Sequence, residues 1–144
     1  MRVYFDSAYI AKCYLNEPDS KRVRRAARQV EGLYSSMLAV AEISCVLLRN
    51  LREGSLNTKQ ADLVRNLFLK DIQASIWNLL PVSDGLFYRL EGFVRTLPSD
   101  VYLRAGDGVH LITAREAGFR EVWSNDRHLL RAASYFGLEG KTVQ

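Results

Sequence analysis

Short apolar runs of strand length alternate with longer stretches of helical periodicity along the chain. Strands are predicted at 2–5, 33–36, 75–82, 121–124 and 141–143. Helices are predicted at 7–15, 20–30, 37–52, 58–72, 84–97, 105–119 and 125–137. Because strands that alternate with helices pair in parallel, the pattern predicts an α/β fold, a three-layer α/β/α sandwich with a small parallel sheet. We expect residues 1–144 to form one domain of this kind.

The predicted helix at 37–52 is apolar on nearly every side, which is typical of a buried helix, yet Glu42 lies in its middle. Burying a carboxylate costs roughly several kcal/mol unless a cation compensates. A salt bridge to Arg49 on the same helix or a bound metal ion would each supply that cation. Which of these cations lies next to the Glu42 carboxylate depends on the tertiary structure.

Three further acids lie at the starts of predicted helices, where aspartate is a common capping residue. Asp6 and Asp126 follow predicted strands, and Asp107 lies in the entrance of the helix at 105–119. The carboxyl ends of parallel strands meet at one edge of the sheet, where ligands bind. Glu42, about one turn into a helix that follows a strand, can approach the same point.

Four converging carboxylates repel one another strongly unless a divalent cation lies among them. Oxygen ligands without histidine or cysteine favour Mg²⁺, with Mn²⁺ possible, over zinc. A metal ion held by a few carboxylates is the arrangement of enzymes that cleave phosphodiester bonds. The pattern therefore indicates a hydrolase with a metal-binding site at Asp6, Glu42, Asp107 and Asp126.

Four segments together resemble the characteristic blocks of PIN domains, and within that family the VapC-type toxins of bacterial and archaeal toxin–antitoxin pairs. They are YFDSAYIAKCYLNEP, SSMLAVAEISCVLLR, RAGDGVHLITAREAG and WSNDRHLLRAA. The resemblance spans nearly the whole chain and implies a Mg²⁺-dependent endoribonuclease that cleaves RNA with metal-activated water. It also implies a homodimer and a cognate antitoxin that blocks the acidic site.

The resemblance assigns the catalytic and metal-binding roles to Asp6, Glu42, Asp107 and Asp126. Glycine replaces the alanine that PIN domains commonly carry after the third acid, at position 108, and Gly106 precedes that acid. Because glycine adds backbone freedom, we expect the entrance of this helix to be loose.

Neighbouring polar residues could support the acids. Ser7, Ser124 and Asn125 could orient carboxylates or a water molecule, although helix capping is an equal alternative. Arg104 could hold a phosphate group or pair with an acid. His110 lies one turn after Asp107 on an apolar helix, a position typical of a core histidine with a satisfied hydrogen bond; a general base is the alternative.

Composition and charge are those of a globular protein that tolerates an anionic partner. Hydrophobic residues make up 48% of the chain and charged residues 25%, with a formal net charge of +4. The basic segment KRVRRAAR, residues 21–28, either follows an RNA backbone or forms a solvated helix face.

Cysteine usage and hydropathy indicate a cytoplasmic protein. Cys13 and Cys45 lie in apolar surroundings, which favours reduced core thiols over a disulfide. The apolar run after Arg2 ends at Asp6, too early for a secretory signal, and the longest apolar stretch is too short and too charged to span a membrane.

Three other functions remain open. A PIN-domain nuclease of RNA processing would share the site without being a toxin. A catalytically silent nucleic-acid-binding module would bind RNA regardless of chelators. A phosphohydrolase with Asp6 as nucleophile is weaker, since it would want an aspartate two residues later, where the chain has Ala8.

Overall fold

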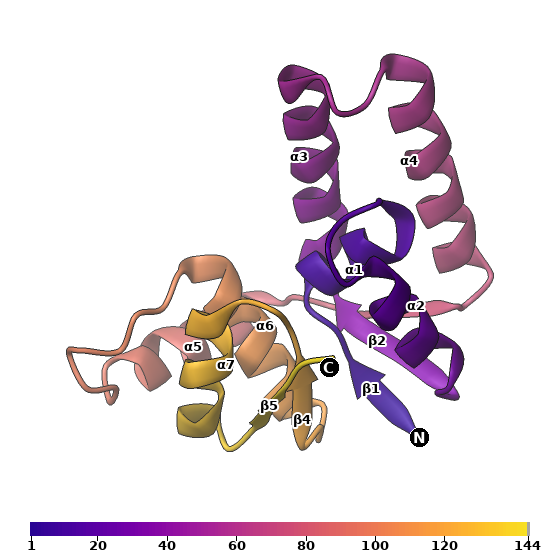
Figure 1. Cartoon of the computed structure of the whole chain (residues 1–144). Helices are drawn as coiled ribbons and strands as arrows, with labels where there is room; N and C mark the ends of the chain where they lie inside the picture. The colour runs from indigo at the N-terminus through magenta and orange to yellow at the C-terminus, as the bar shows by residue number, and fades with distance from the viewer. Residues whose placement is uncertain (144) are drawn as a thin grey trace.

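A computed structural model of the protein describes residues 1–143, with a parallel sheet at its centre (Figure 1). Strands β1 (Arg2–Tyr4), β2 (Gly32–Ser36) and β3 (Trp77–Leu80) pair in the order β1-β2-β3. Strands β4 (Glu121–Trp123) and β5 (Glu139–Lys141) form a second parallel pair. An isolated parallel bridge between Phe5 and Trp123 places β4 beside β1, so the strands follow the order β3-β2-β1-β4-β5.

The helices follow the predicted ranges closely. They are α1 (Ser7–Tyr14), α2 (Ser20–Arg28), α3 (Leu38–Glu53), α4 (Thr58–Gln73), α5 (Asp84–Val94), α6 (Ala105–Glu116) and α7 (Arg127–Ala132), followed by a 3₁₀ turn at Ala133–Phe136. In Figure 1, α3 and α4 form a long hairpin that projects from one end of the molecule, and only the beginning of α3 lies against α6. None of the helices within residues 1–143 has the length and apolar character needed to cross a membrane.

Strand alternation divides the core into two layers. In β1, Val3 and Phe5 pack into a cluster with residues of α1, α3 and α4, whereas Tyr4 packs into a cluster with residues of α6 and α7. Successive strand residues point to opposite faces of a sheet, so a strand buried on both faces must be apolar throughout. The predicted α/β/α sandwich with a parallel sheet is therefore confirmed.

The end of the chain differs from the prediction. The last strand lies at Glu139–Lys141, not at 141–143, because its residues Glu-Gly-Lys carry no apolar alternation that could mark them. Gly140 packs directly against α7: a β-carbon there would lie 2.8 Å from Leu130 Cδ2. The helix predicted at 125–137 begins only at Arg127 and ends at Ala132. The 3₁₀ turn that follows it stops at Gly137, which has a φ of 72°.

The expectation that α3 is buried on every side was wrong. Ala39, Ile43 and Leu47 are buried, but Leu48 is 63% exposed. The apolar composition of this helix therefore overstated its burial.

The cysteines are only partly as predicted. Both are free thiols, but Cys45 is exposed on α3 rather than a core residue. Cys13 is half-buried, and burial raises the pKa of its thiol to about 12, which makes it a poor nucleophile.

The sheet–helix packing predicts a clear stability difference between neighbouring positions of α4. Phe68 is 2% exposed and contacts the ring of Tyr14, with ring centroids 5.8 Å apart. Phe68→Ala should lower the free energy of unfolding by about 3–5 kcal/mol, since it leaves a cavity. Leu69 is 43% exposed, so Leu69→Ala should change the free energy of unfolding by no more than about 0.5 kcal/mol. Urea denaturation of both variants measures the difference, and equal losses would contradict the packing described.

Candidate functional site

The acidic site lies at the carboxyl edge of the sheet, between β1 and β4. The chain leaves β1 through α1 and α2 to reach β2 on one side, while β4 lies on the other side of β1. Such a reversal of strand order opens a crevice beyond the strand ends. Asp6 follows β1 and Asp126 follows β4, so the fold brings both to this crevice, as predicted from their positions in the sequence.

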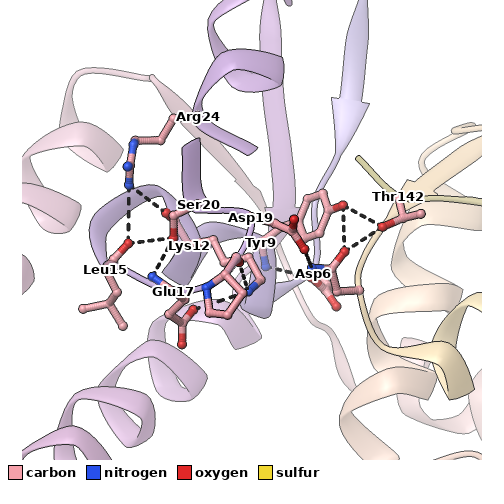
Figure 2. Close-up of polar contacts among 11 residues, drawn as sticks. Asp6, Tyr9, Lys12, Leu15, Glu17, Asp19, Ser20, Arg24 and Thr142 are labelled. Atoms are coloured by element: carbon pink, nitrogen blue, oxygen red, sulfur yellow. Dashed lines mark hydrogen bonds and ion pairs between the residues drawn. The ribbon is translucent and has the colours of Figure 1, made fainter. Parts of the chain in front are cut away.

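Asp6 is a buried carboxylate that caps α1. Its Oδ1 accepts a hydrogen bond from the Tyr9 amide at 3.0 Å, and its Oδ2 accepts one from the Ser124 hydroxyl. Figure 2 shows Asp6 below Tyr9, whose hydroxyl group reaches in the other direction toward Thr142. Burial raises the pKa of Asp6, although the His110 charge and the Ser124 hydrogen bond partly oppose it. The neighbouring groups therefore do not fully offset the cost of burying the Asp6 negative charge.

Glu42 has the opposite balance of forces. Its Oε1 accepts from the Ser7 hydroxyl at 2.7 Å and from His110 Nε2 at 2.7 Å. Burial alone would raise the pKa of Glu42, but His110, with help from Ser7 and the Arg104 charge, holds it below its ordinary value. The Glu42 side chain is 35% exposed, so the expectation that it is fully buried was wrong. Its charged partner is His110 and not Arg49.

His110 is a core histidine with satisfied hydrogen bonds, the reading favoured for its position on an apolar helix. It is 2% exposed, and Tyr4 Oη lies 2.8 Å from Nδ1. Because a carboxylate only accepts hydrogen bonds, Nε2–H of His110 donates to Glu42. Its partner is thus an acid of the candidate site, which makes His110 a positioning residue for Glu42.

Arg104 bridges the other two acids. Its Nε donates to Asp107 Oδ2 at 3.1 Å, and its Nη2 donates to Asp126 Oδ2. Asp107 lies in the first turn of α6, whereas Asp126 caps α7 by accepting from the His128 amide at 2.8 Å. Arg104 was expected either to hold a phosphate group or to pair with an acid. In the structure it pairs with two acids.

Ser124 connects the two halves of the site. Its buried hydroxyl donates to Asp6 and accepts from the Asp126 amide at 2.9 Å, so both aspartates share one hydrogen-bond network. Asn125 faces away from the acids: its Oδ1 accepts from the hydroxyl groups of Tyr9 at 3.1 Å and Thr142 at 2.6 Å. It therefore supports α1 and the segment after β5, and the one carboxylate that its Nδ2 contacts is Asp19 at 3.4 Å, outside the four acids of the site.

The glycines around Asp107 close the site rather than loosen it. A β-carbon at Gly106 would lie 3.1 Å from Glu42 Oε2, and one at Gly108 would lie 3.2 Å from two carbons of Leu90. The absence of side chains lets α6 approach α3 and α5 closely. The expected loose helix entrance was wrong, because tertiary packing fills the space that glycine leaves.

The donor chemistry of the site fits a hard divalent cation, although no complete set of ligands is assembled. Within residues 1–143, no three His, Cys, Asp or Glu side chains converge closely enough to form a metal site. Asp107 and Asp126 instead share the guanidinium of Arg104. A divalent ion would replace this cation, since the oxygens that Arg104 neutralises are those that Mg²⁺ prefers.

Sequence reasoning missed the tyrosines that support the acids. Tyr4 orients His110 from β1, and Tyr9 holds Asn125 and Thr142 from α1. Alternation along β1 could have shown which face Tyr4 occupies. The contact between Tyr4 and His110, which are 106 residues apart, could not have been predicted, because it depends on how α6 packs on that face.

Comparison with known proteins identifies the type of fold. The family model for the PIN domain matches residues 3–135. No curated relative is detectably similar in sequence.

Solved structures match over almost their full lengths. FitAB bound to an IR36 DNA fragment has a TM-score of 0.70 and 17% identity, covering 99% of this chain and 94% of that one. VapBC2 from Rickettsia felis, bound to a promoter DNA fragment, has a TM-score of 0.70 and 10% identity, covering 100% of each chain. Mycobacterium tuberculosis VapC20, a toxin that cleaves the sarcin–ricin loop, has a TM-score of 0.68 and 13% identity, covering 95% and 98%.

The uncompensated charge of Asp6 predicts that its removal stabilises the metal-free protein. The pKa of Asp6 is raised above 3.8, so ionisation costs stability at neutral pH, and this cost disappears as the pH falls through the raised pKa toward 3.8. In EDTA at pH 7, Asp6→Asn should raise the melting temperature, on the order of 3 °C for each kcal/mol regained. The gain should shrink toward pH 4.

Asp62→Asn is the matched control for this measurement. Asp62 is 59% exposed on α4, so its replacement should leave the melting temperature almost unchanged at both pH values. A destabilised Asp6→Asn protein at pH 7 would show instead that the hydrogen bonds of the carboxylate outweigh the cost of its burial.

Proposed function

The chain belongs to the PIN-domain family, and from this premise we propose that it is a Mg²⁺-dependent endoribonuclease, the toxin of a VapBC-type toxin–antitoxin pair. The observation that carries the proposal is a polar network at the carboxyl edge of the sheet. In it, Ser124 links Asp6 to Asp126 and Arg104 links Asp126 to Asp107, while Ser7, next to Asp6 in the chain, binds Glu42. Likeness to VapC20, an RNA-cleaving toxin, supports RNA as the substrate.

Asp6 and Asp107 would hold the metal ion, with Glu42 and Asp126 assisting. When bound, Mg²⁺, or Mn²⁺ in its place, supplies activation of water and neutralisation of the charge that develops on the phosphate. The unequal environments of Asp6 and Glu42 suit this task. Asp6 is dry and poorly compensated, so it favours a cation, whereas Glu42 is kept ionised by His110 and Ser7.

The remaining polar residues position these groups. Ser124 fixes one oxygen of Asp6 and the backbone of Asp126, and Ser7 fixes Glu42. Arg104, once a metal ion neutralises Asp107 and Asp126, would be available to bind the scissile phosphate, because a guanidinium pairs well with phosphate oxygens. The exposed Lys21, Arg22, Arg25 and Arg28 of α2 would add salt-dependent affinity for the RNA backbone.

An antitoxin and a second copy of the chain are the proposed protein partners. The similar structures include FitAB and VapBC2 complexes, which support a toxin that works with an antitoxin. The exposed apolar residues Leu48, Leu63 and Leu67 of the α3–α4 hairpin provide a surface for protein contact. We place the protein in the cytoplasm, where its RNA substrate lies and where the free thiols are stable.

RNA cleavage by the purified protein tests the proposed activity. Incubation with total RNA and Mg²⁺ should give discrete cuts with 5′-phosphate ends, and EDTA should abolish them. Asp6→Asn and Asp107→Asn should each slow cleavage more than about 100-fold, since even outer-shell partners of metal ligands contribute about 10- to 100-fold. Asp62→Asn, on the exposed face of α4, should cleave at the wild-type rate. RNA binding without cleavage, unaffected by EDTA, would identify a silent binding module instead.

Growth of cells that express the chain separates a toxin from an RNA-processing nuclease. Induction of the wild-type protein should arrest growth, and co-expression of a small protein encoded beside it should restore growth. Asp6→Asn should not arrest growth at all. Cleavage in vitro without growth arrest would assign the chain to RNA processing.

A further inference from the structure

A pocket beside the acidic site has no role in the proposed chemistry. It lies between α7 and the segment that precedes α6, and its volume is about 100 Å³. Its lining combines aromatic rings with one charge of each sign: Asp100, Tyr102, His128, Arg131 and Tyr135, with Val101 and Ala132.

The aromatic lining is exposed, unlike the aromatic residues of the core. Tyr102 is 56% exposed and Tyr135 46% exposed. The Tyr102 ring packs on the His128 ring, with centroids 4.1 Å apart and planes inclined by 33°. Because the two rings support each other, Tyr102 presents a large apolar surface to solvent at little conformational cost.

Two residues of the pocket lining lie close in the chain to residues of the acidic site. Tyr102 lies two residues before Arg104, which contacts Asp107 and Asp126. His128 lies two residues after Asp126 and donates its amide hydrogen to that carboxylate at 2.8 Å. A group in the pocket therefore lies next to whatever binds at Asp107 and Asp126.

The chemistry of the lining selects the kind of group. Flat aromatic surfaces stack on nucleobases, and this contact tolerates any base. The Asp100 carboxylate accepts hydrogen bonds and the Arg131 guanidinium donates them, which matches the mixed donors and acceptors of a base edge. A phosphate group is less suited, because the Asp100 carboxylate in the lining would repel it.

We propose that this pocket binds an unpaired nucleobase of the RNA, on a nucleotide that flanks the scissile phosphate, with Tyr102 as the stacking residue. The proposal rests on the proposed nuclease function and extends it: the pocket contributes to the choice of cleavage site. Because the base must leave its own stack to enter, the pocket favours RNA loops and single strands over duplexes.

Cleavage of an RNA library with a randomised single-stranded segment, in the presence of Mn²⁺, tests this inference. Tyr102→Ala should lower the cleavage rate about 10- to 100-fold and flatten the base preference at one position next to the cut. Tyr102→Phe should retain both the rate and the preference, since it keeps the ring. Tyr88→Ala is the matched control: Tyr88 is 78% exposed on α5 and does not line the pocket.

Thermal denaturation with and without Mn²⁺ accompanies the assay. Tyr102→Ala should keep the wild-type rise in melting temperature on addition of Mn²⁺, which shows an intact acidic site. If the wild-type protein cuts no RNA in the library, the nuclease function itself fails. If Tyr102→Ala cuts at the wild-type rate with unchanged preference, only the base pocket is overturned. Loss of the Mn²⁺ response in Tyr102→Ala would overturn it as well, since Tyr102 would then be structural.

Discussion

The burial of Asp6 at the junction of β1 and β4 is the constraint on which the surrounding structure depends. A carboxylate in this position must be held by donors, and the chain supplies them from both halves of the sheet: the Tyr9 amide from α1 and the Ser124 hydroxyl after β4. Ser124 in turn fixes Asp126, and His110 fixes Glu42. The polar network is thus organised around negative charge that the protein alone does not fully neutralise.

Hydropathy patterns predicted nearly all the helices and strands because each is buried on at least one face. The exception is β5 (Glu139–Lys141), whose residues carry no hydrophobic pattern. Its position is set by tertiary contacts: the strand pairs with β4, and Gly140 packs against Leu130. The over-interpretation of α3 has a related cause. Leu48 is apolar and yet exposed, so apolar composition alone overstates how much of a helix is buried.

The contacts that the proposed site residues make follow only in part from the sequence. Strand order brings Asp6 and Asp126 together, and this follows from the alternation of strands and helices. The partner of Glu42 does not follow from it, since Glu42 and His110 are 68 residues apart and meet only because α6 packs on α3. Gly106, which suggested looseness in the sequence, is what allows that close approach.

The two halves of the sheet meet along a narrow seam. β1 and β2 share a ladder of paired residues, as do β4 and β5, whereas β1 and β4 are joined at the isolated bridge between Phe5 and Trp123. Asp6 lies on one side of this seam, and Asp126 and Asp107 on the other. The placement of Asp6 relative to Asp126 therefore depends on the contacts at the seam itself: the Asp6 amide donates to the Trp123 carbonyl oxygen at 3.1 Å, and the Ser124 hydroxyl donates to the Asp6 carboxylate.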